Sequence, residues 1–254
     1  MGKHKNMHDF DGAIIVTIDG PAGTGKSTVA EKVAKELGLD FLDTGAMYRA
    51  ATAIVLDYGI DPHDPKAIVE KVAEADLHFD WRTTPPALLA WLQPIDHRLR
   101  DKDVTANVSQ LASVRELRQH LVLKQRIIAY QHPRLVSEGR DQGSVVFPDA
   151  LVKFYLDADP AVRAKRRAIQ SKRLSRDTLP EEAAKIIAAT QEEILTRDHL
   201  DQSRSDGPLV CPEGAVVVDT SDMTEREVID HLVRVVRATI AQKRHDDDKG
   251  CHEQ

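Results

Sequence analysis

A glycine-rich loop between an apolar run and a helical pattern constrains this chain more than any other feature. Residues 13–19 read AIIVTID, a continuous apolar run that is typical of a strand buried in a parallel sheet. Residues 20–27 follow as GPAGTGKS, the spacing G-x-x-x-x-G-K-[ST] of a phosphate-binding loop. Apolar residues then recur at helical spacing up to Gly38, a helix stop signal. This order of strand, loop and helix predicts a nucleoside triphosphate site.

The chemistry of the loop assigns roles to its residues. Glycines let the backbone N–H groups turn towards phosphate oxygens, and the N-terminus of the following helix adds its positive dipole end. Lys26 is expected to reach the β- and γ-phosphates, Ser27 to bind Mg²⁺, and Thr28 to lie near the α-phosphate. The predicted ATP-binding residues are Gly20, Pro21, Ala22, Gly23, Thr24, Gly25, Lys26, Ser27 and Thr28. Motors, switches, transporters and kinases all share such a loop, so the reaction must be inferred from the rest of the chain.

Strand-like and helical patterns alternate along most of the remaining sequence. This alternation predicts an α/β fold, a five-stranded parallel sheet flanked by helices, with ligands beyond the carboxyl ends of the strands. Residues 62–108 mix proline pairs, charges and short apolar pieces and are expected to form an excursion from the main sheet. The further strands are predicted at 40–42, 134–139, 151–158 and 215–220, and the further helices at 44–59, 109–131, 160–205 and 224–243.

Two motifs at the predicted ligand edge suggest a seat for a second phosphate. Thr44, Tyr48 and Arg49 lie in the first turns of a predicted helix, where a hydroxyl, a phenol and a guanidinium can hold a phosphate monoester. The alternative is an ordinary capped helix with a solvated arginine. Arg140 and Asp141 follow the strand at 134–139, and Arg140 can hold a phosphate with both guanidinium arms. The alternative for this pair is a local salt bridge in a turn.

From these motifs onward the chain resembles the bacterial cytidylate kinases, which phosphorylate CMP and dCMP with ATP. The resemblance extends over about residues 13–240, and GRDQGSVVFPDA is its most specific segment. The matching segments, in the order of that family, are IDGPAGTGKST, LDTGAMYR, SQLASVRELR, EGRDQGSVVFPDA, LDADPAVRAKRR and RDHLDQSR. The resemblance implies a P-loop kinase with an inserted NMP-binding subdomain and a helical lid.

The resemblance also implies which residues bind CMP. Arg140, with Tyr48 and Arg49, matches the residues that hold the CMP phosphate, and Asp141 matches an aspartate that contacts the sugar near the metal. The other matching positions read the base and sugar or contact the nucleoside. The full CMP-binding set is Thr44, Tyr48, Arg49, Ser109, Arg118, Arg140, Asp141, Arg197, Asp201 and Arg204. A helix cap and an exposed arginine remain the alternative for Ser109 and Arg118, and a surface ion-pair ladder for the residues of 197–204.

The basic stretch after Pro160 is interpreted as the lid, at about residues 160–180. Its arginines would close over the transferring phosphoryl group and neutralise its charge, although a solvated basic face is the alternative. An ionised acceptor phosphate needs no general base, so catalysis is expected to be positioning and charge neutralisation, with Mg²⁺ as the cofactor. The predicted catalytic residues are Lys26, Arg49, Arg140, Asp141, Arg163 and Arg167, with Ser27 as the magnesium ligand.

The domain organisation follows from these motifs. Residues 13–243 are expected to form one domain, with its core at 13–61 and 109–243 and the NMP-binding insert at about 62–108. Residues 1–12 and 244–254 are expected to be flexible tails. The insert departs from the related family because Pro94 stands where a turn glycine is expected.

Composition narrows the class of protein. A net charge of −6 argues against a general nucleic-acid binder. Cys211 and Cys251 make neither a disulfide framework nor a zinc spacing, and no apolar run is long enough for a membrane span. A cytoplasmic monomer that binds ATP and CMP or dCMP is therefore expected, without nucleic-acid or membrane partners.

Other functions stay open at this point. The nearest alternative is a kinase of the same fold that acts on UMP, AMP or a sugar. A regulatory ATP-binding module would need no acceptor pocket, so the motifs at 140–141 and 197–204 argue against it. A nucleic-acid-linked ATPase is disfavoured because basic residues cluster only in the predicted lid.

Overall fold

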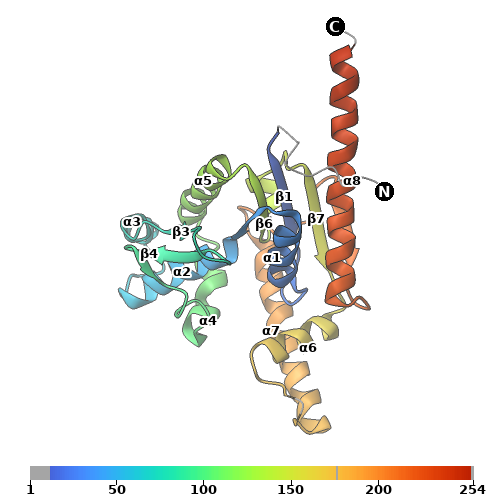
Figure 1. The fold of residues 1–254 in the computed structure, drawn as a ribbon. Coiled ribbons are helices and arrows are strands. Elements are labelled where there is room, and N and C mark those ends of the chain that lie inside the picture. The colour runs from blue at the N-terminus through green and yellow to red at the C-terminus, as the bar shows by residue number, and fades with distance from the viewer. Residues whose placement is uncertain (1–11, 176, 253–254) are drawn as a thin grey trace.

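The computed structural model describes residues 12–175 and 177–252, with only the backbone described from residue 248 onward. A five-stranded sheet forms the centre of the protein, and every pair of neighbouring strands in it is parallel (Figure 1). This confirms the predicted fold class. In spatial order the strands are β2 (Asp40–Asp43), β6 (Arg134–Glu138), β1 (Ile14–Asp19), β7 (Val152–Asp157) and β8 (Val216–Asp219).

The register of the sheet brings three functional segments to one edge. Ile18 of β1 lies opposite Glu138 of β6, and Asp19 lies opposite Tyr155 of β7. Asp43, at the end of β2, also lies opposite Glu138. Since all the strands are parallel, the loops that leave their carboxyl ends emerge side by side.

Helices bury both faces of the sheet. One hydrophobic cluster joins the sheet to α1 (Lys26–Leu37) and α8 (Glu225–His252), which pack against each other. Gly38 ends α1 in a left-handed conformation, as its place in the sequence predicted. A second cluster joins the sheet to α2 (Thr44–Asp57), α5 (Arg115–Gln131) and the insert.

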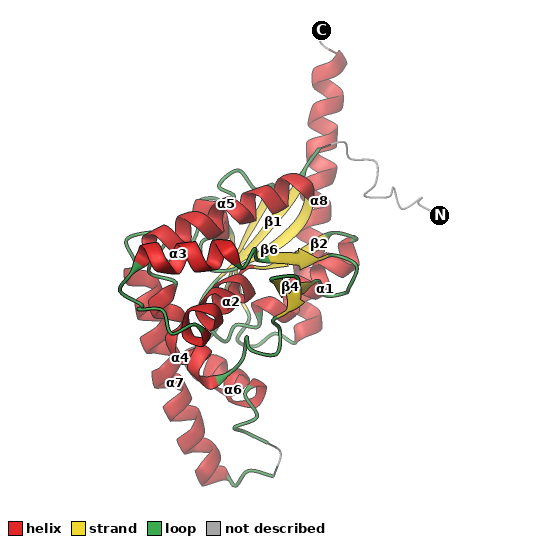
Figure 2. Cartoon of the chain, turned by 90° about the vertical axis from the view of Figure 1, so that its left-hand side faces the viewer, coloured by secondary structure: helices red, strands yellow, loops and turns green. Residues whose placement is uncertain are grey.

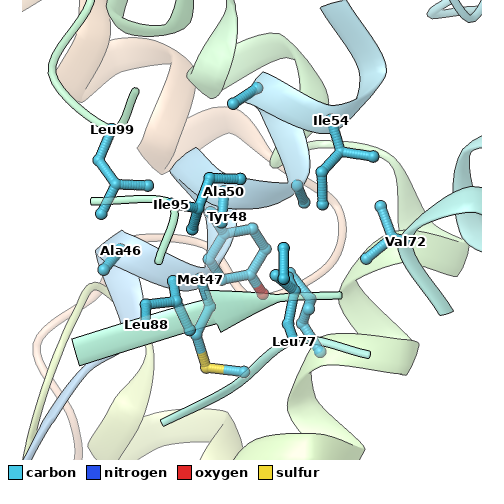
Figure 3. Packing of buried hydrophobic residues seen from close by; sticks show 14 of the residues in the cluster. Ala46, Met47, Tyr48, Ala50, Ile54, Val72, Leu77, Leu88, Ile95 and Leu99 are labelled. Atoms are coloured by element: carbon cyan, nitrogen blue, oxygen red, sulfur yellow. The ribbon is translucent and has the colours of Figure 1, made fainter. Parts of the chain in front are cut away.

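The insert is a small subdomain built on α2. It contains α3 (Pro65–Glu74) and a three-stranded antiparallel sheet of β3 (His78–Asp80), β4 (Ala87–Ala90) and β5 (Gln93–Pro94). Met47 and Ile54 of α2 are fully buried in one cluster with Leu77 and Leu88 of the insert (Figure 3). This apolar contact fixes the insert against the helix that carries Tyr48 and Arg49.

The predicted long helix at 109–131 is wrong, because two helices meet there. The helix α4 (Lys102–Leu111) begins inside the predicted insert, and α5 starts only after residues 112–114. Ser113 Oγ donates to the carbonyl of Gln110 at 2.6 Å, and Arg118 Nη1 donates to the carbonyl of Ala112 at 3.2 Å. These hydrogen bonds satisfy the backbone at the break. The predicted insert boundary at residue 108 therefore falls within α4.

The hairpin of the insert turns at Trp91 and Leu92. Their φ angles are 48° and 63°, in the left-handed region that a two-residue hairpin loop requires and that glycine or asparagine usually supplies. Pro94 lies beyond this turn, in β5, so it does not take the place of a turn residue. Tyr58 contacts the Trp91 ring, with ring centroids 5.2 Å apart.

The C-terminal half of the chain forms the remaining helices. The stretch predicted as helical at 160–205 consists of α6 (Pro160–Gln170) and α7 (Pro180–Ser203), which pack against each other. Figures 1 and 2 place both at the end of the sheet opposite to the projecting end of α8. Asp159 caps α6, as predicted, by accepting from Ala161 N at 2.8 Å.

The structure describes the two predicted tails to different extents. The predicted helix end near Lys243 is wrong, because α8 continues to His252, through most of the predicted tail at 244–254. Residues 253–254 lie outside the described residues. The predicted N-terminal tail lies outside the described residues except for residue 12. Among the described helices, none has both the length and the apolar character needed to cross a membrane.

A matched pair of leucine substitutions tests the packing of the insert. Leu88 is 1% exposed and Leu92 is 71% exposed, although both lie in the same hairpin. Leu88→Ala is expected to lower the free energy of unfolding by about 2–5 kcal/mol, because it leaves a cavity against α2. Leu92→Ala is expected to change it by less than about 0.5 kcal/mol. Denaturant unfolding measures both values, and equal losses would contradict the described packing.

Candidate active site

The loop after β1 has backbone angles at three positions that favour glycine. Gly20 has a φ of 143°, and a Cβ there would collide with the carbonyl oxygen of Leu156 in β7. Gly23 and Gly25 also have positive φ angles, of 84° and 90°. The loop therefore folds closely against the sheet, with the Ala22 N–H bound to Asp198, in a conformation that suits the binding of phosphate oxygens by backbone N–H groups.

Lys26 lies inside the loop. Its Nζ donates to the carbonyl of Pro21 at 2.6 Å and lies 3.4 Å from Thr24 Oγ1. Burial, followed by the positive charge of Arg140, lowers the pKa of Lys26 to about 7. A phosphate beside this ammonium group would favour its charged form, so the position suits an anionic ligand.

A buried carboxylate stands opposite the loop. Ser27 Oγ donates to Glu138 Oε1 at 2.7 Å, and Glu138 is 4% exposed. Burial, followed by the negative charge of Asp43, raises the pKa of Glu138 to about 8. A Cβ on Gly45 would lie 3.2 Å from Asp43 Oδ1 and 4.0 Å from Glu138 Oε1, so both carboxylates converge on the same point.

This oxygen set fits the chemistry of magnesium. A hydroxyl and two carboxylates are the hard ligands that Mg²⁺ takes from proteins, together with phosphates and water. No group of three or more His, Cys, Asp and Glu side chains able to hold a metal occurs among the described residues. The residues therefore suit an ion that shares its ligands with a nucleotide. Glu138 and Asp43 were missed by the sequence reasoning, and the available signal was their position at the carboxyl ends of strands.

Arginines crowd together near Lys26 of the loop. We call Arg49, Arg100, Arg140, Arg167 and Arg197 the guanidinium cluster, because their charges act on one another. Burial, followed by the charge of Arg167, lowers the pKa of Arg49 to about 10. Burial, followed by the charges of Arg140 and Arg49, lowers the pKa of Arg197 to about 9. Like charges repel in a partly desolvated site, so a bound anion would relieve this cluster.

Few carboxylates offset the charge of the cluster. Arg140 Nε donates to Asp201 Oδ2 at 3.0 Å, and Arg204 Nε donates to the carbonyl of Asp201 at 3.2 Å. Burial works against the charged form of Arg140, but Asp201 and Glu138 more than compensate and raise its pKa. Arg197 Nε and Arg204 Nη2 are buried and have no hydrogen-bond partner among the described residues. Such unsatisfied donors are costly unless a ligand accepts from them.

A second buried pair lies next to this cluster. Arg118 and Asp141 form an ion pair with both side chains 4% exposed, and Arg118 lies 5.4 Å from the centre of the Tyr48 ring. A Cβ on Gly207 would collide with both members of the pair, so the loop after α7 covers it closely. Ser109 lies half-buried near the end of α4, one turn before the break that Arg118 contacts.

Thr44 and Arg49 make contacts that the sequence did not predict. Thr44 Oγ1 donates to the carbonyl of Glu138 at 2.7 Å, and so ties the start of α2 to the end of β6. Arg49 Nη1 donates to the carbonyl of Leu99 at 3.0 Å and to Thr105 Oγ1 at 3.1 Å. Arg49 therefore links α2 to the insert as well as belonging to the guanidinium cluster.

The structure separates the arginines of the predicted lid. Arg163 is buried, pairs with Asp198, and donates through Nη1 to the carbonyl of Ala22 at 3.0 Å. Arg163 thus holds the backbone of the phosphate-binding loop at Ala22. Arg167, one helical turn later, lies in the guanidinium cluster. Arg166 donates to the carbonyl of Thr220, just after β8, at 2.6 Å.

Asp19 is a further residue that the sequence reasoning missed. Its carboxylate accepts from Gln142 N at 2.8 Å and from Gly143 N at 2.7 Å. Burial outweighs these hydrogen bonds and raises the pKa of Asp19 to about 6. Because Arg140 and Asp141 directly precede Gln142, Asp19 holds these two residues near the end of β1.

The parallel sheet, the phosphate-binding loop and the facing guanidinium cluster together define a P-loop kinase. A family model described as cytidylate kinase matches residues 16–238. The chain belongs to the cytidylate kinase family.

Two relatives match over nearly their whole length, and a third matches as part of a longer protein. A cytidylate kinase from Corynebacterium efficiens is 42% identical over 233 residues, which are 90% of this chain and 96% of that protein. One from Caldanaerobacter subterraneus subsp. tengcongensis is 40% identical over 222 residues, 87% of this chain and 94% of that protein. A bifunctional pantoate ligase/cytidylate kinase from Synechococcus elongatus is 43% identical over 230 residues, 88% of this chain but 42% of that protein.

The raised pKa of Glu138 predicts a change in stability with pH. Its value of about 8 exceeds the ordinary 4.5, so the folded state binds this proton more tightly than the unfolded state. The associated stability is complete below about pH 4.5 and is lost as the pH rises through about 8. Glu138→Gln keeps a neutral acceptor for Ser27 at every pH. Its melting temperature relative to wild type is therefore expected to rise between pH 5 and pH 9.

The exposed Glu182 on α7 supplies the matched control. Glu182→Gln removes the same charge without removing a buried group, so its melting temperature relative to wild type should stay nearly constant over this range. Thermal unfolding followed at several pH values measures both differences. A difference for Glu138→Gln that stays constant or shrinks with pH would contradict the assignment.

Proposed function

We propose that this protein transfers the γ-phosphoryl group of ATP to CMP or dCMP, giving ADP and CDP or dCDP. The guanidinium cluster is the observation that carries the proposal. Few carboxylates neutralise its charge, so it suits an anionic ligand, and it lies beside Lys26 of the phosphate-binding loop. Two adjacent anion sites suit a donor and an acceptor that both carry phosphate. Membership in the cytidylate kinase family supports cytidine as the acceptor nucleoside.

On the donor side, the loop at 20–28 holds the triphosphate through its backbone N–H groups. Lys26 leaves its contact with Pro21 and binds the β- and γ-phosphates. Ser27, with Glu138 and Asp43 behind it, would hold Mg²⁺ on the nucleotide. When bound, this ion neutralises charge on the phosphates.

On the acceptor side, Arg49 and Arg140 hold the phosphate of CMP, with Tyr48 beside them. The buried Arg197 Nε and Arg204 Nη2 supply unsatisfied donors for the acceptor nucleotide. The base and sugar are contacted by the remaining predicted residues, which are Thr44, Ser109, Arg118, Asp141 and Asp201. The closeness of Arg118, Asp141 and Tyr48 supports their acting as one pocket wall.

The chemical step needs alignment more than proton transfer. An oxygen of the ionised CMP phosphate attacks the γ-phosphorus, and the bond from that phosphorus to the β–γ bridging oxygen breaks. Arg49 and Arg140 hold the attacking phosphate in line, which supplies the orientation. Arg167 belongs to the guanidinium cluster and would neutralise charge that develops on the transferring group, whereas Arg163 binds the backbone of the phosphate-binding loop.

The acceptor assignment predicts the effect of Arg140→Ala. Binding of ATP should stay nearly intact, whereas turnover of CMP should fall by at least about a hundredfold, because a charge-assisted phosphate contact is lost. The matched control is Arg226→Ala, an exposed arginine of α8 that pairs with Asp230 and Glu36. Steady-state rates and ATP-binding calorimetry separate the two effects. An ordinary rate for Arg140→Ala would refute the acceptor assignment.

An acceptor panel tests the proposed function itself. CMP, dCMP, UMP and AMP are each supplied with Mg-ATP, and ADP release is followed in a coupled assay. We expect turnover with CMP and dCMP and little with AMP. No turnover with either cytidine nucleotide would overturn the proposal, and preference for another acceptor would point to a different small-molecule kinase. The monomeric state and the cytoplasmic location stay predictions.

A further inference from the structure

The helix α7 contributes to both nucleotide sites. Arg197 and Asp201 belong to the acceptor side, where Asp201 accepts from Arg140. Asp198, the residue next to Arg197, turns the other way and contacts the donor loop. One turn of helix therefore carries side chains that reach both sites.

The contact between α7 and the donor loop is specific and buried. Asp198 Oδ1 accepts from Ala22 N at 2.9 Å, and its other carboxylate oxygen pairs with Arg163. Arg163 in turn donates to the carbonyl of Ala22 at 3.0 Å. Asp198 and Arg163 are each 5% exposed. Both polar groups of the Ala22 peptide backbone are thus held by a single buried ion pair.

The backbone of α6 closes the same contact from the other side. A Cβ on Gly23 would lie 2.8 Å from the carbonyl oxygen of Arg163, so loop and helix touch without space for a side chain. A displacement of α6 or α7 must therefore move the loop residues 22 and 23. Packed elements of this kind shift as units because protein interiors are close-packed.

We propose that Asp198 is a positioning residue that couples the two nucleotide sites through α7. Binding of the acceptor to Arg197 and Asp201 restricts the motion of α7. Because Asp198 of this helix binds the backbone of Ala22, the motion of the loop is restricted as well. The loop N–H groups then meet the triphosphate in their binding geometry. By thermodynamic reciprocity, the triphosphate favours acceptor binding by the same factor. This inference rests on the proposed function, since it needs two nucleotide sites.

The alternative is that the ion pair only stabilises the fold. Buried ion pairs often contribute little net stability, because the cost of desolvation offsets the attraction. Replacing both partners by apolar residues of similar size often leaves stability unchanged or raises it, whereas removing one partner is destabilising. This difference allows the structural role to be separated from the positioning role.

The experiment compares Asp198→Asn with wild type by calorimetry. A non-hydrolysable Mg-ATP analogue is titrated with and without CMP. In wild type, CMP should tighten analogue binding. In Asp198→Asn, analogue affinity should fall by about tenfold, CMP affinity alone should stay nearly constant, and the mutual enhancement should disappear. The exposed Glu192 on α7 gives the matched control, since Glu192→Gln removes the same charge and should behave as wild type.

A double variant keeps the test valid if the single variant is unstable. Arg163→Met combined with Asp198→Leu should recover part of the melting temperature lost in the single variant, because no unpaired charge stays buried. It should not recover the enhancement, because its apolar side chains cannot hold the Ala22 backbone. If CMP tightens analogue binding in the double variant as it does in wild type, the proposal is overturned. It is also overturned if CMP does not tighten analogue binding in wild type. A wild type that binds both nucleotides but turns over no cytidine nucleotide would instead overturn the proposed function.

Discussion

Repulsion among the arginines of the guanidinium cluster is the constraint on which this site depends. Isolated charges of one sign are costly to bury, and burial together with neighbouring arginines lowers the pKa values of Arg49, Arg167 and Arg197. The fold nevertheless brings the arginines of the cluster together from α2, α6, α7, the loop after β6 and the segment between β5 and α4. Stability alone does not explain this arrangement. A ligand that carries several negative charges does.

The opposite arrangement holds on the other side of the loop. Glu138 places a carboxyl group next to Ser27, and burial, followed by the negative charge of Asp43, raises the pKa of Glu138. A cation suits this side and an anion suits the cluster. Lys26 lies between them, at the point where the phosphates of a donor would meet both. Carboxyl groups and guanidinium groups thus both act on Lys26, an arrangement that suits the proposed transfer of a phosphoryl group.

The sequence predicted the sheet because apolar runs such as those of β1 and β8 alternate with helical patterns. It predicted the loop because glycine spacing directly reflects backbone geometry. The break between α4 and α5 was not predictable, since residues 112–114 contain neither glycine nor proline. Their conformation depends on Arg118, which reaches back to Ala112. Similarly, Arg163 and Arg167 look alike in the sequence. Only the position of α6 against the loop decides that the first supports Ala22 and the second joins the cluster.

Affinity for a bisubstrate analogue shows directly whether the donor loop and the guanidinium cluster are two halves of one site. In such a compound a chain of phosphates links adenosine to cytidine, and its two ends would occupy facing sites at once. Linked ligands gain from a high effective concentration when the geometry allows both ends to bind. We expect this compound to bind at least about a hundredfold more tightly than ATP or CMP alone. Binding no tighter than that of ATP would contradict the arrangement of donor loop and guanidinium cluster as two halves of one site.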